Sequence, residues 1–259
     1  MTESRFDGRI LTASDMSAEA LSRFYDDVIL PNFAPNELMP RADFLHGFGG
    51  CGTQSHGVFA IDAEGSVVGG LVAEWFASSR VVLLAYLAVR PALRGRGIAH
   101  QIASVAAPLL SSLKPTLVVA EVEDPNFHAS SRAGEPMARL RLFAELGGQV
   151  LLLPYFQPRL DSHLDRVQHL LLLVFSIDDS VIVRRQHKFY GPVDAVDGSI
   201  IDDFLVEYFT MAEGSLPRDE EFEQLRSLCQ ASMGVPLLPI FESPRVAGHS
   251  AREASDGSK

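Results

Sequence analysis

Arginines and glycines are concentrated in one short stretch of the sequence, RPALRGRG at positions 90–97. It follows nine residues typical of a buried strand, VVLLAYLAV at 81–89, and precedes a helical pattern of apolar residues. Glycines let the main chain approach an anion, and the first N–H groups of a helix lack intrahelical acceptors and carry partial positive charge. The side chains of Arg94 and Arg96 would add charge-assisted hydrogen bonds. The stretch therefore predicts a turn that binds a phosphate group.

Three known phosphate-binding patterns can be compared with this turn. A Walker loop needs a lysine followed by serine or threonine, and neither pair follows these glycines. The dinucleotide pattern G-x-G-x-x-G would begin at Gly95, but His100 occupies the place of the third glycine. The third pattern, Gln/Arg-x-x-Gly-x-Gly/Ala, is matched by Arg94, Gly97 and Ala99. In this respect the turn resembles the pyrophosphate loop of the GNAT acetyltransferase superfamily.

The resemblance continues on both sides of the turn. Residues 87–91, LAVRP, look like the L-x-V-x-P that leads into the loop in that superfamily. Residues 142–148, LFAELGG, are similar to its L-Y-x-x-L-G-F. The matching elements run in order from about residue 8 to residue 177. The resemblance implies an α/β fold with a GNAT-like mixed, mostly antiparallel central sheet flanked by helices.

The spacing of apolar and turn residues predicts the order of the elements. Ser17 can cap a helix, Pro136 suits the first turn of a later helix and Gly147 suits its end. Strands are expected near Ile10 and over 57–79 (two strands), 81–89, 116–122, 150–153 and 169–176. Helices are expected after Ser17, over 42–48, from Gly97, over 136–147, and over 200–212 and 219–231. The chain is thus divided into a GNAT-like core (1–177), a C-terminal helical extension (178–241) and a disordered tail (242–259).

Composition and charge limit the classes of partner. The chain has 259 residues, 47% of them hydrophobic, and a formal net charge of −11. The acidic balance argues against nucleic acid as a partner, and no apolar run reaches the roughly 20 residues that span a membrane. Two cysteines, Cys51 and Cys229, form neither a disulfide framework nor a metal-ligand cluster. With no secretory signal pattern at its N-terminus, the sequence predicts a cytoplasmic protein without metal, membrane or nucleic-acid partners.

The resemblance implies acetyl-CoA as the co-substrate and a primary amine of a small molecule or peptide as the acceptor. In the superfamily the fourth and fifth strands part, and the pantetheine arm pairs with the main chain of the fourth. The corresponding residues here are Leu87, Ala88 and Val89. The pyrophosphate would bind the main chain of six residues: Arg94, Gly95, Arg96, Gly97, Ile98 and Ala99. Main-chain N–H groups of the fourth strand, in 87–89, would stabilise the negative charge that forms on the acetyl oxygen during the attack.

An attacking amine must lose a proton, and acidic residues are the candidates for the base. Glu121 and Glu123 share one face of the strand expected at 116–122, which is unusual for core positions because burying an unpaired charge is costly. Two like charges this close would also raise one of the two pKa values toward neutrality. The alternative is that both contact solvent or pair with Arg139 or Arg141. Glu74 on the third strand and Glu37 in the proline-rich loop 31–40 are rival candidates. We expect the latter two to contact the substrate.

The departing thiolate would benefit from a proton donor. Many members of the superfamily use the tyrosine of L-Y-x-x-L-G-F, but Phe143 stands there in this sequence and has no proton to give. Tyr155, just after a predicted strand, is a candidate substitute. Alternatively, Tyr155 is only a packed aromatic side chain with its hydroxyl at the surface.

Two other functions compete with amine acetylation. A catalytically silent module of the same fold would bind CoA or a protein partner without turnover. A flavin- or nicotinamide-dependent enzyme has only the incomplete glycine pattern in its favour. The apolar helical faces in 200–209 and 225–238 need a covering surface, on the same chain or on the second copy in a homodimer.

Overall fold

The computed structural model describes residues 6–49, 55–128, 136–230 and 234–246. Within these residues the strands form a mixed sheet in the order β1-β2-β3-β4-β5-β8-β6-β11-β10-β9, with β7 also paired to β8. The strands are β1 (Arg9–Thr12), β2 (Ser55–Ile61), β3 (Val67–Phe76), β4 (Val81–Val89), β5 (Leu117–Glu123), β6 (Gln149–Leu151), β7 (Tyr155–Gln157), β8 (Val167–Ile177), β9 (Ile182–His187), β10 (Gly191–Val196) and β11 (Val235–Pro239). All recorded pairings are antiparallel except that of β4 with β5.

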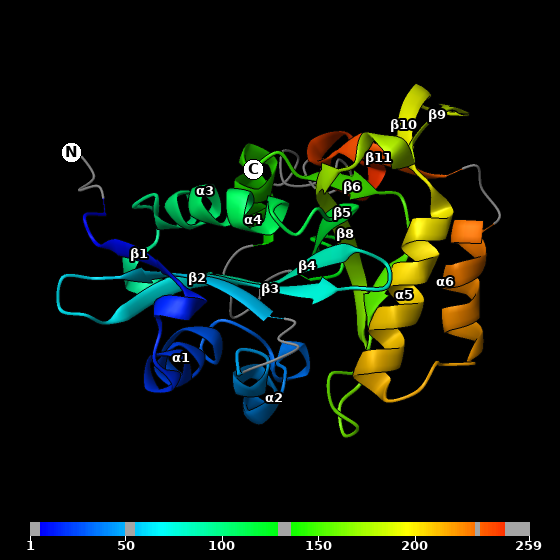
Figure 1. Cartoon of the computed structure of the whole chain (residues 1–259). Helices are drawn as coiled ribbons and strands as arrows, with labels where there is room; N and C mark the ends of the chain where they lie inside the picture. Colours follow the sequence, from blue (N-terminus) through cyan, green and yellow to red (C-terminus); the bar gives the residue numbers. More distant parts are fainter. Residues whose placement is uncertain (1–5, 50–54, 129–135, 231–233, 247–259) are drawn as a thin grey trace, which may run out of the picture.

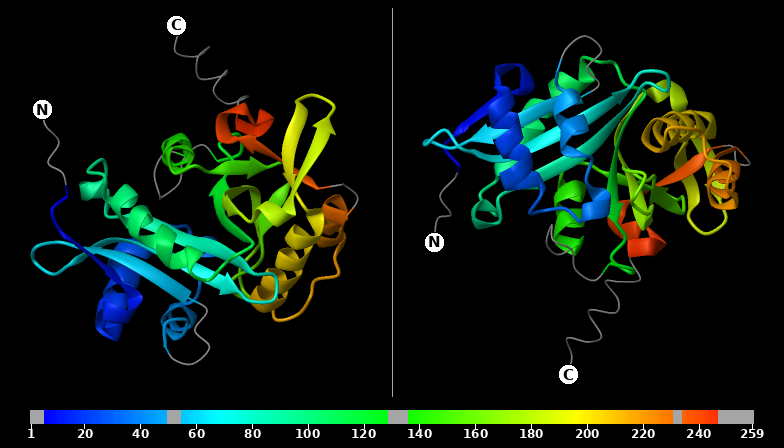
Figure 2. Two further views of the ribbon diagram at one scale, coloured as in Figure 1. Left: turned by 45° about the horizontal axis from the view of Figure 1, so that its top comes forward. Right: turned by 90° about the horizontal axis from the view of Figure 1, so that it is seen from below.

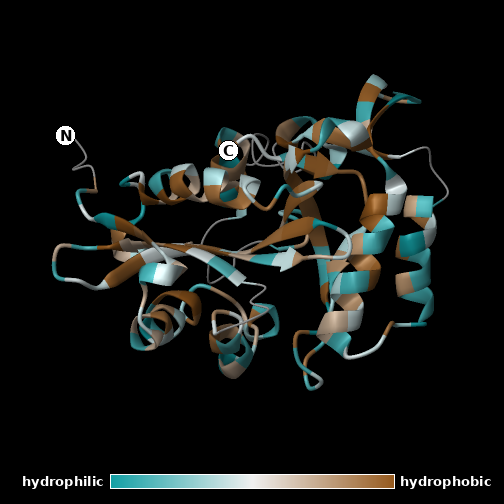
Figure 3. Ribbon diagram, in the orientation of Figure 1, coloured by the Kyte–Doolittle hydropathy of each residue, from teal (hydrophilic) through white to brown (hydrophobic). Residues whose placement is uncertain are grey.

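Helices cover both faces of this sheet (Figure 1). They are α1 (Ala18–Phe24), α2 (Arg41–His46), α3 (Ile98–Ser111), α4 (Pro136–Glu145), α5 (Gly198–Glu213) and α6 (Glu220–Gln230). Helices α3 and α4 lie on one face, and α1 and α2 on the other, with α5 and α6 beside the far end of the sheet (Figures 1 and 2). The strands are hydrophobic along most of their length, whereas α6 is largely hydrophilic (Figure 3). The fold class predicted from the sequence is therefore confirmed.

Local sequence signals account for several element boundaries. The Ser17 side chain accepts a hydrogen bond from the main-chain N–H of Ala20 (3.1 Å) and caps α1. After α1 ends, the chain continues through a π-helical turn over Tyr25–Ile29 before the proline-rich loop. The helix α3 runs past Pro108 to Ser111. Its apolar side faces the sheet, where Ile98 and Ile102 are buried against strand residues.

The extension after residue 177 contains more than the two predicted helices. It also supplies strands β9, β10 and β11, and β11 enters the main sheet by pairing with β6. The largest apolar cluster joins residues of the core strands, such as Val119 and Leu172, to Phe204 and Phe222 of the extension. The same chain therefore covers most of the described apolar residues in 200–209 and 225–238, whereas Leu228 is 47% exposed. Since β6 and β11 contribute only three and five residues, their periodicity is too short to be recognised in the sequence.

The expected disordered tail differs in part from the structure. Val246 is fully buried, and Arg245 donates a hydrogen bond to the buried Asp124 (3.0 Å). Residues 242–246 therefore pack on the end of β5. The rest of that expected tail, 247–259, and Cys51 lie outside the described residues. In the part that is described, no helix is long and apolar enough to cross a membrane.

Candidate active site

Strands β4 and β5 part halfway along their length. Their parallel pairing runs from Val81 with Leu117 to Leu84 with Ala120. Beyond that point β4 continues to Val89 and β5 to Glu123, with no further pairing between them. A shift in the β3–β4 register, next to Ala73, marks the same level of the sheet. Two neighbouring strands that stop pairing leave main-chain groups free for another molecule.

A cavity of about 460 Å³ occupies the gap between the parted strands. Its lining includes eight of the nine residues that the sequence analysis assigned to the cofactor: Leu87, Ala88, Val89, Arg94, Gly95, Gly97, Ile98 and Ala99. Arg96 is exposed and does not line it. The opposite wall comes from β5 and α4, and Glu121 is part of it. The structure thus brings the arginine-glycine turn and one predicted catalytic carboxylate to a single cavity.

The turn has the geometry of an anion site. Gly95 and Gly97 adopt positive φ angles of 77° and 74°, and a Cβ atom added to either would meet no atom within 4 Å. The first main-chain bond of α3 runs from the N–H of Gln101 to the carbonyl of Gly97 (3.1 Å). The N–H group of Arg94 donates to the carbonyl of Pro91 (3.3 Å), whereas those of the first helical residues, 98–100, have no carbonyl of a preceding turn to bind and lie at the positive end of the helix dipole. A pyrophosphate group fits this open, N–H-rich turn.

Arg94 links the turn to the loop that follows α1. Its guanidinium donates to the side-chain oxygen of Asn32, which is buried, and to the main-chain carbonyl of Val89 (3.4 Å). Asn32 in turn donates to the carbonyl of Val28 (2.6 Å). This chain of hydrogen bonds holds the positive charge of Arg94 at the cavity edge.

Helix α4 forms the wall opposite the turn. Phe143 lines the cavity and packs edge-on against Phe175, with ring centroids 5.5 Å apart. It therefore presents only an apolar ring where the family motif has a tyrosine. At the mouth, His100 of α3 and Glu145 of α4 approach to 3.1 Å.

Glu121 is the carboxylate at the cavity with the most complete set of hydrogen bonds. Its Oε1 accepts from the Tyr155 hydroxyl (2.5 Å), and its Oε2 accepts from the Gln157 side chain (2.9 Å) and the Tyr208 hydroxyl (3.3 Å). Burial raises the pKa of Glu121 to about 7, while these three hydrogen bonds oppose that rise. A carboxyl group with this pKa can accept a proton near neutral pH.

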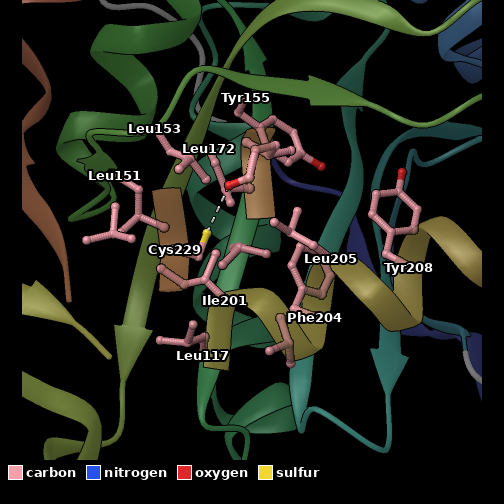
Figure 4. Close-up of a cluster of buried hydrophobic side chains, with 14 of the residues drawn as sticks. Leu117, Leu151, Leu153, Tyr155, Leu172, Ile201, Phe204, Leu205, Tyr208 and Cys229 are labelled. Carbon is pink, nitrogen blue, oxygen red and sulfur yellow. Dashed lines mark hydrogen bonds between the residues drawn. The ribbon is translucent and has the colours of Figure 1, made fainter. Parts of the chain in front are cut away.

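The tyrosines around Glu121 do not face the cavity. Tyr155 is 1% exposed, does not line the cavity and gives its hydrogen bond to Glu121. Burial raises its pKa well above the usual value of 10. Figure 4 shows Tyr155 of β7 and Tyr208 of α5 at one edge of the apolar cluster. The hydroxyl that the sequence suggested as a thiolate donor is therefore bound to Glu121 and does not line the cavity.

Glu123 and Glu37 lie away from the cavity wall. Glu123 is buried and has Arg139 Nη1 at 3.4 Å and His128 Nδ1 at 3.9 Å. The pairing with Arg139 is the alternative that the sequence left open for this residue. The Oε2 of Glu37 accepts from the main-chain N–H of Ala34 (2.8 Å). Burial, and then the charge of Glu123, raise the pKa of Glu37.

Glu74 is a buried carboxylate of β3. It is 6% exposed, and no described residue donates a hydrogen bond to it. Burial raises its pKa to about 7. Since an ionised carboxylate is costly to bury without a partner, the folded protein favours the protonated form of Glu74.

The state of Glu74 predicts an unusual pH dependence of stability. Its pKa is about 7 in the folded protein and near 4.5 in the unfolded chain, so the unfolded chain releases its proton first. Its contribution to the free energy of unfolding is therefore full below pH 4.5 and is lost as the pH rises to about 7. Glu74→Gln cannot titrate and should gain about 3 kcal/mol over the wild type across that window. Chemical denaturation across this pH range measures the gain.

The matched control for this measurement is Glu64→Gln, because Glu64 is exposed in the turn between β2 and β3. It should follow the wild-type curve. If Glu74→Gln also followed the wild-type curve at every pH, Glu74 would not be a buried, unpaired carboxyl group.

Several residues of the site carry no functional signal in the sequence. Asn32 and Phe33 reach the cavity from the loop after α1, and Arg139, Arg141 and Leu142 from α4. Gln157 and Tyr208 reach Glu121 from distant parts of the chain. In the sequence Tyr208 belongs to an apolar helical stripe with Phe204 and Leu205, and nothing there marks its hydroxyl as functional. Among the described residues, no group of three or more His, Cys, Asp or Glu side chains is placed to hold a metal ion.

Comparisons with solved structures match several proteins described as acetyltransferases. A Bacteroides thetaiotaomicron protein described as an acetyltransferase of the GNAT family has 21% identity and a TM-score of 0.48, covering 66% of this chain and 89% of its own. Ard1 from Thermoplasma volcanium has 17% identity and a TM-score of 0.45, covering 66% and 99%. The IAA acetyltransferase from Bacillus cereus has 12% identity and a TM-score of 0.40, covering 64% and 98%. A search of curated proteins found no match.

A family model also matches the sequence directly. The model of the acetyltransferase (GNAT) family matches residues 21–132. The matched segment contains β4, the arginine-glycine turn, α3 and β5, which are the elements that enclose most of the cavity. Over residues 21–132 the sequence is therefore similar to the acetyltransferase (GNAT) family.

Proposed function

We propose that this protein transfers an acetyl group from acetyl-CoA to a primary amine by direct attack of the amine on the thioester. One observation carries the proposal: β4 and β5 part over a cavity that joins the anion-binding turn to Glu121. The turn supplies the affinity for the cofactor, and Glu121 supplies the base. Both are needed for acetyl transfer, and a module that only binds CoA has no need for the second.

The residues of the turn and of β4 would hold acetyl-CoA. The main-chain N–H groups of 95–99 bind the pyrophosphate, helped by the side-chain charge of Arg94, whose own N–H donates to Pro91 (3.3 Å). The main chain of Leu87, Ala88 and Val89 pairs with β3 on one side, and its open side toward β5 binds the pantetheine amides and supplies the N–H that stabilises the negative charge on the carbonyl oxygen. Ala88 and Val89 are buried, so these hydrogen bonds form with little competing water.

Glu121 accepts the proton that the acceptor amine must lose. Its Oε1 holds one hydrogen bond, from Tyr155, and therefore keeps a lone pair for the amine. As the amine nitrogen bonds to the acetyl carbon, the carbon–sulfur bond breaks and the electron pair leaves with the CoA sulfur. Phe143 provides no proton at this position, so we assign the protonation of the thiolate to solvent. Tyr155, Gln157 and Tyr208 act on the reaction by orienting Glu121.

The test of this proposal has two parts. Acetyl-CoA should raise the melting temperature of the protein by several degrees, because a ligand that binds only the folded state stabilises it. Release of the CoA thiol should then be measured with a panel of primary alkylamines, aralkylamines, amino acids and peptides. For a Kd in the micromolar range, a ligand concentration about 100 times the Kd should nearly saturate the protein. The absence of any rise in melting temperature at that concentration of acetyl-CoA would refute the proposal. Binding without turnover of any amine would instead identify a silent module.

A further inference from the structure

A carboxylate of α5 binds the C-terminal extension to the core. The Oε1 of Glu207 accepts a hydrogen bond from the main-chain N–H of Ser78 (3.0 Å), and its Oε2 accepts from the N–H (2.8 Å) and the hydroxyl (2.8 Å) of Ser79. Partial burial would raise the pKa of Glu207, but these hydrogen bonds outweigh it and lower the pKa. The ionised carboxylate therefore holds α5 on the turn between β3 and β4.

This turn leads directly to the closed end of the gap between β4 and β5. It ends at Val81, whose pairing with Leu117 begins the short parallel ladder that stops at Leu84. Within the turn, Arg80 adopts a φ of 57°, a conformation that costs a non-glycine residue free energy and persists only where surrounding contacts hold it. The hydrogen bonds of Glu207 to the two preceding residues are contacts of this kind. They therefore fix both the turn and the place where α5 lies against it.

The residue that follows Glu207 in α5 reaches the base. The Tyr208 hydroxyl donates to Oε2 of Glu121 (3.3 Å), and its ring packs edge-on against Phe76, the last residue of β3, with centroids 5.3 Å apart. Phe204, one turn earlier in α5, packs against the same ring of Phe76 at 5.3 Å. Because consecutive residues of a helix move together, the place of Glu207 on the turn also determines where the Tyr208 hydroxyl lies.

The charge state of Glu121 depends on this hydroxyl. The titratable groups that face Glu121 come from four elements: Glu74 of β3, Tyr86 of β4, Tyr155 of β7 and Tyr208 of α5. Burial raises the pKa of Glu121 to about 7, and the hydrogen bond from Tyr208 is one of three that oppose that rise. Of those three donors, Tyr208 is the one that the extension supplies. Withdrawing it would leave the ionised form of Glu121 less stable and raise the pKa further.

We propose that Glu207 is a positioning residue for the base: by holding α5 on the turn between β3 and β4, it keeps the Tyr208 hydroxyl on Glu121, and the C-terminal extension thereby takes part in the reaction. This inference rests on the proposed acetyl transfer. Glu207 does not line the cavity, so it acts on Glu121 through Tyr208. When Glu207 no longer holds the turn, Glu121 needs a higher pH to accept the proton of the amine.

The experiment compares the wild type with Glu207→Gln, Tyr208→Phe, the double variant of these two and the control Asp203→Asn. In Glu207→Gln an NH2 group replaces one of the two accepting oxygens and faces an N–H of the turn. Asp203 is an exposed carboxylate one turn earlier on the same helix. Asp203→Asn therefore removes the same charge from α5 without touching the turn.

Two readouts are needed. The first is the pKa of Glu121 by NMR titration of protein labelled at the glutamate carboxyl carbons, with the signal assigned by its absence in Glu121→Gln. The second is the pH dependence of kcat/KM for CoA thiol release with the primary amine of the panel that reacts fastest. The acetyl-CoA affinity should stay within about twofold of the wild type in every variant, which shows that each is folded.

In Glu207→Gln, the pKa of Glu121 and the pH at which kcat/KM rises should both move upward by about 0.5, which lowers kcat/KM at pH 6 by about threefold. Tyr208→Phe should show at least the same change. The double variant should match Tyr208→Phe, because Glu207 has nothing to position once the hydroxyl is gone. Asp203→Asn should match the wild type.

A Glu207→Gln variant that melts at a lower temperature but keeps the wild-type pH profile would make Glu207 a purely structural residue and overturn the inference. Additive changes in the double variant would also overturn it, since Glu207 would then act independently of Tyr208. An NMR shift in Glu207→Gln that disappears when Tyr208 is replaced would support the positioning role even if no amine were acetylated, and that second outcome would refute the transferase alone.

Should Glu207→Gln fail to fold, Glu207→Asp provides the second variant. It keeps the charge but shortens the side chain by one methylene group, so it cannot reach both N–H groups of the turn. The pKa of Glu121 and the pH profile should again move upward, and values equal to those of the wild type would contradict the positioning role.

Discussion

Replacing Glu121 by glutamine should lower kcat for amine acetylation by a factor of about 10² to 10⁴, the range that general-base catalysis contributes. The amide cannot accept the ammonium proton, and its single oxygen can keep the hydrogen bond from Tyr155 while its NH2 group takes the place of Oε2. Because the pKa of Glu121 is about 7, kcat/KM of the wild type should rise with pH up to about 7 and then level off. The residual activity of Glu121→Gln should lack that rise. Steady-state rates of CoA thiol release across this pH range measure both effects.

Two comparisons make this prediction specific. The affinity for acetyl-CoA should be the same in Glu121→Gln and the wild type, since the turn that binds the pyrophosphate is unchanged. Tyr155→Phe should keep the base but remove a donor to its ionised form, so the pH at which the rate rises should move upward. A Glu121→Gln variant with wild-type kcat would exclude Glu121 as the base.

Replacing Gly97 by glutamate should weaken the binding of acetyl-CoA by about 100-fold or more, equivalent to about 2.7 kcal/mol. A carboxylate at the start of α3 would occupy the positive end of the helix and repel the pyrophosphate. Gly97 lies at φ 74° with open space around its Cβ position, so the new side chain has room at the site itself. The backbone strain of a non-glycine residue there costs roughly 1 to 2 kcal/mol of stability. Isothermal titration with acetyl-CoA measures the loss of affinity.

Gly65→Glu is the matched control for this substitution. Gly65 has φ 84° in the turn between β2 and β3, and an added Cβ would also meet nothing within 4 Å. The two variants therefore carry similar backbone strain and the same added charge, but only Gly97 lies at the cavity. Equal acetyl-CoA affinities for the two variants would mean that the turn does not hold the pyrophosphate.

Local signals in the sequence were sufficient to predict the cofactor side of the site. The strand β4, the glycines of the turn and the start of α3 are consecutive in the chain, so their types and spacing carry the geometry directly. Eight of the nine predicted cofactor residues line one cavity for this reason. The ninth residue, Arg96, is exposed and does not line the cavity. It lies in a turn, where the direction of a side chain cannot be predicted from a regular period.

The acceptor side could not be predicted in the same way. The environment of Glu121 depends on Tyr155 and Gln157 of β7 and on Tyr208 of α5, residues up to 87 positions away along the chain. Their contact follows from β7 pairing with β8, the neighbour of β5, and from α5 packing into the same apolar cluster as β5 and β8. The strand β7 has only three residues, too few for a period to be seen.

The sequence by itself determined the fold class, the arginine-glycine turn and the two carboxylates of β5, because each depends on residue types at short separations. Only the tertiary structure decided which carboxylate has the environment of a base. Glu121 meets three hydrogen-bond donors at the cavity, whereas Glu123 meets Arg139 and His128. The physical reason is that burial and hydrogen bonding set a pKa, and both are supplied by elements that the chain brings together from far apart.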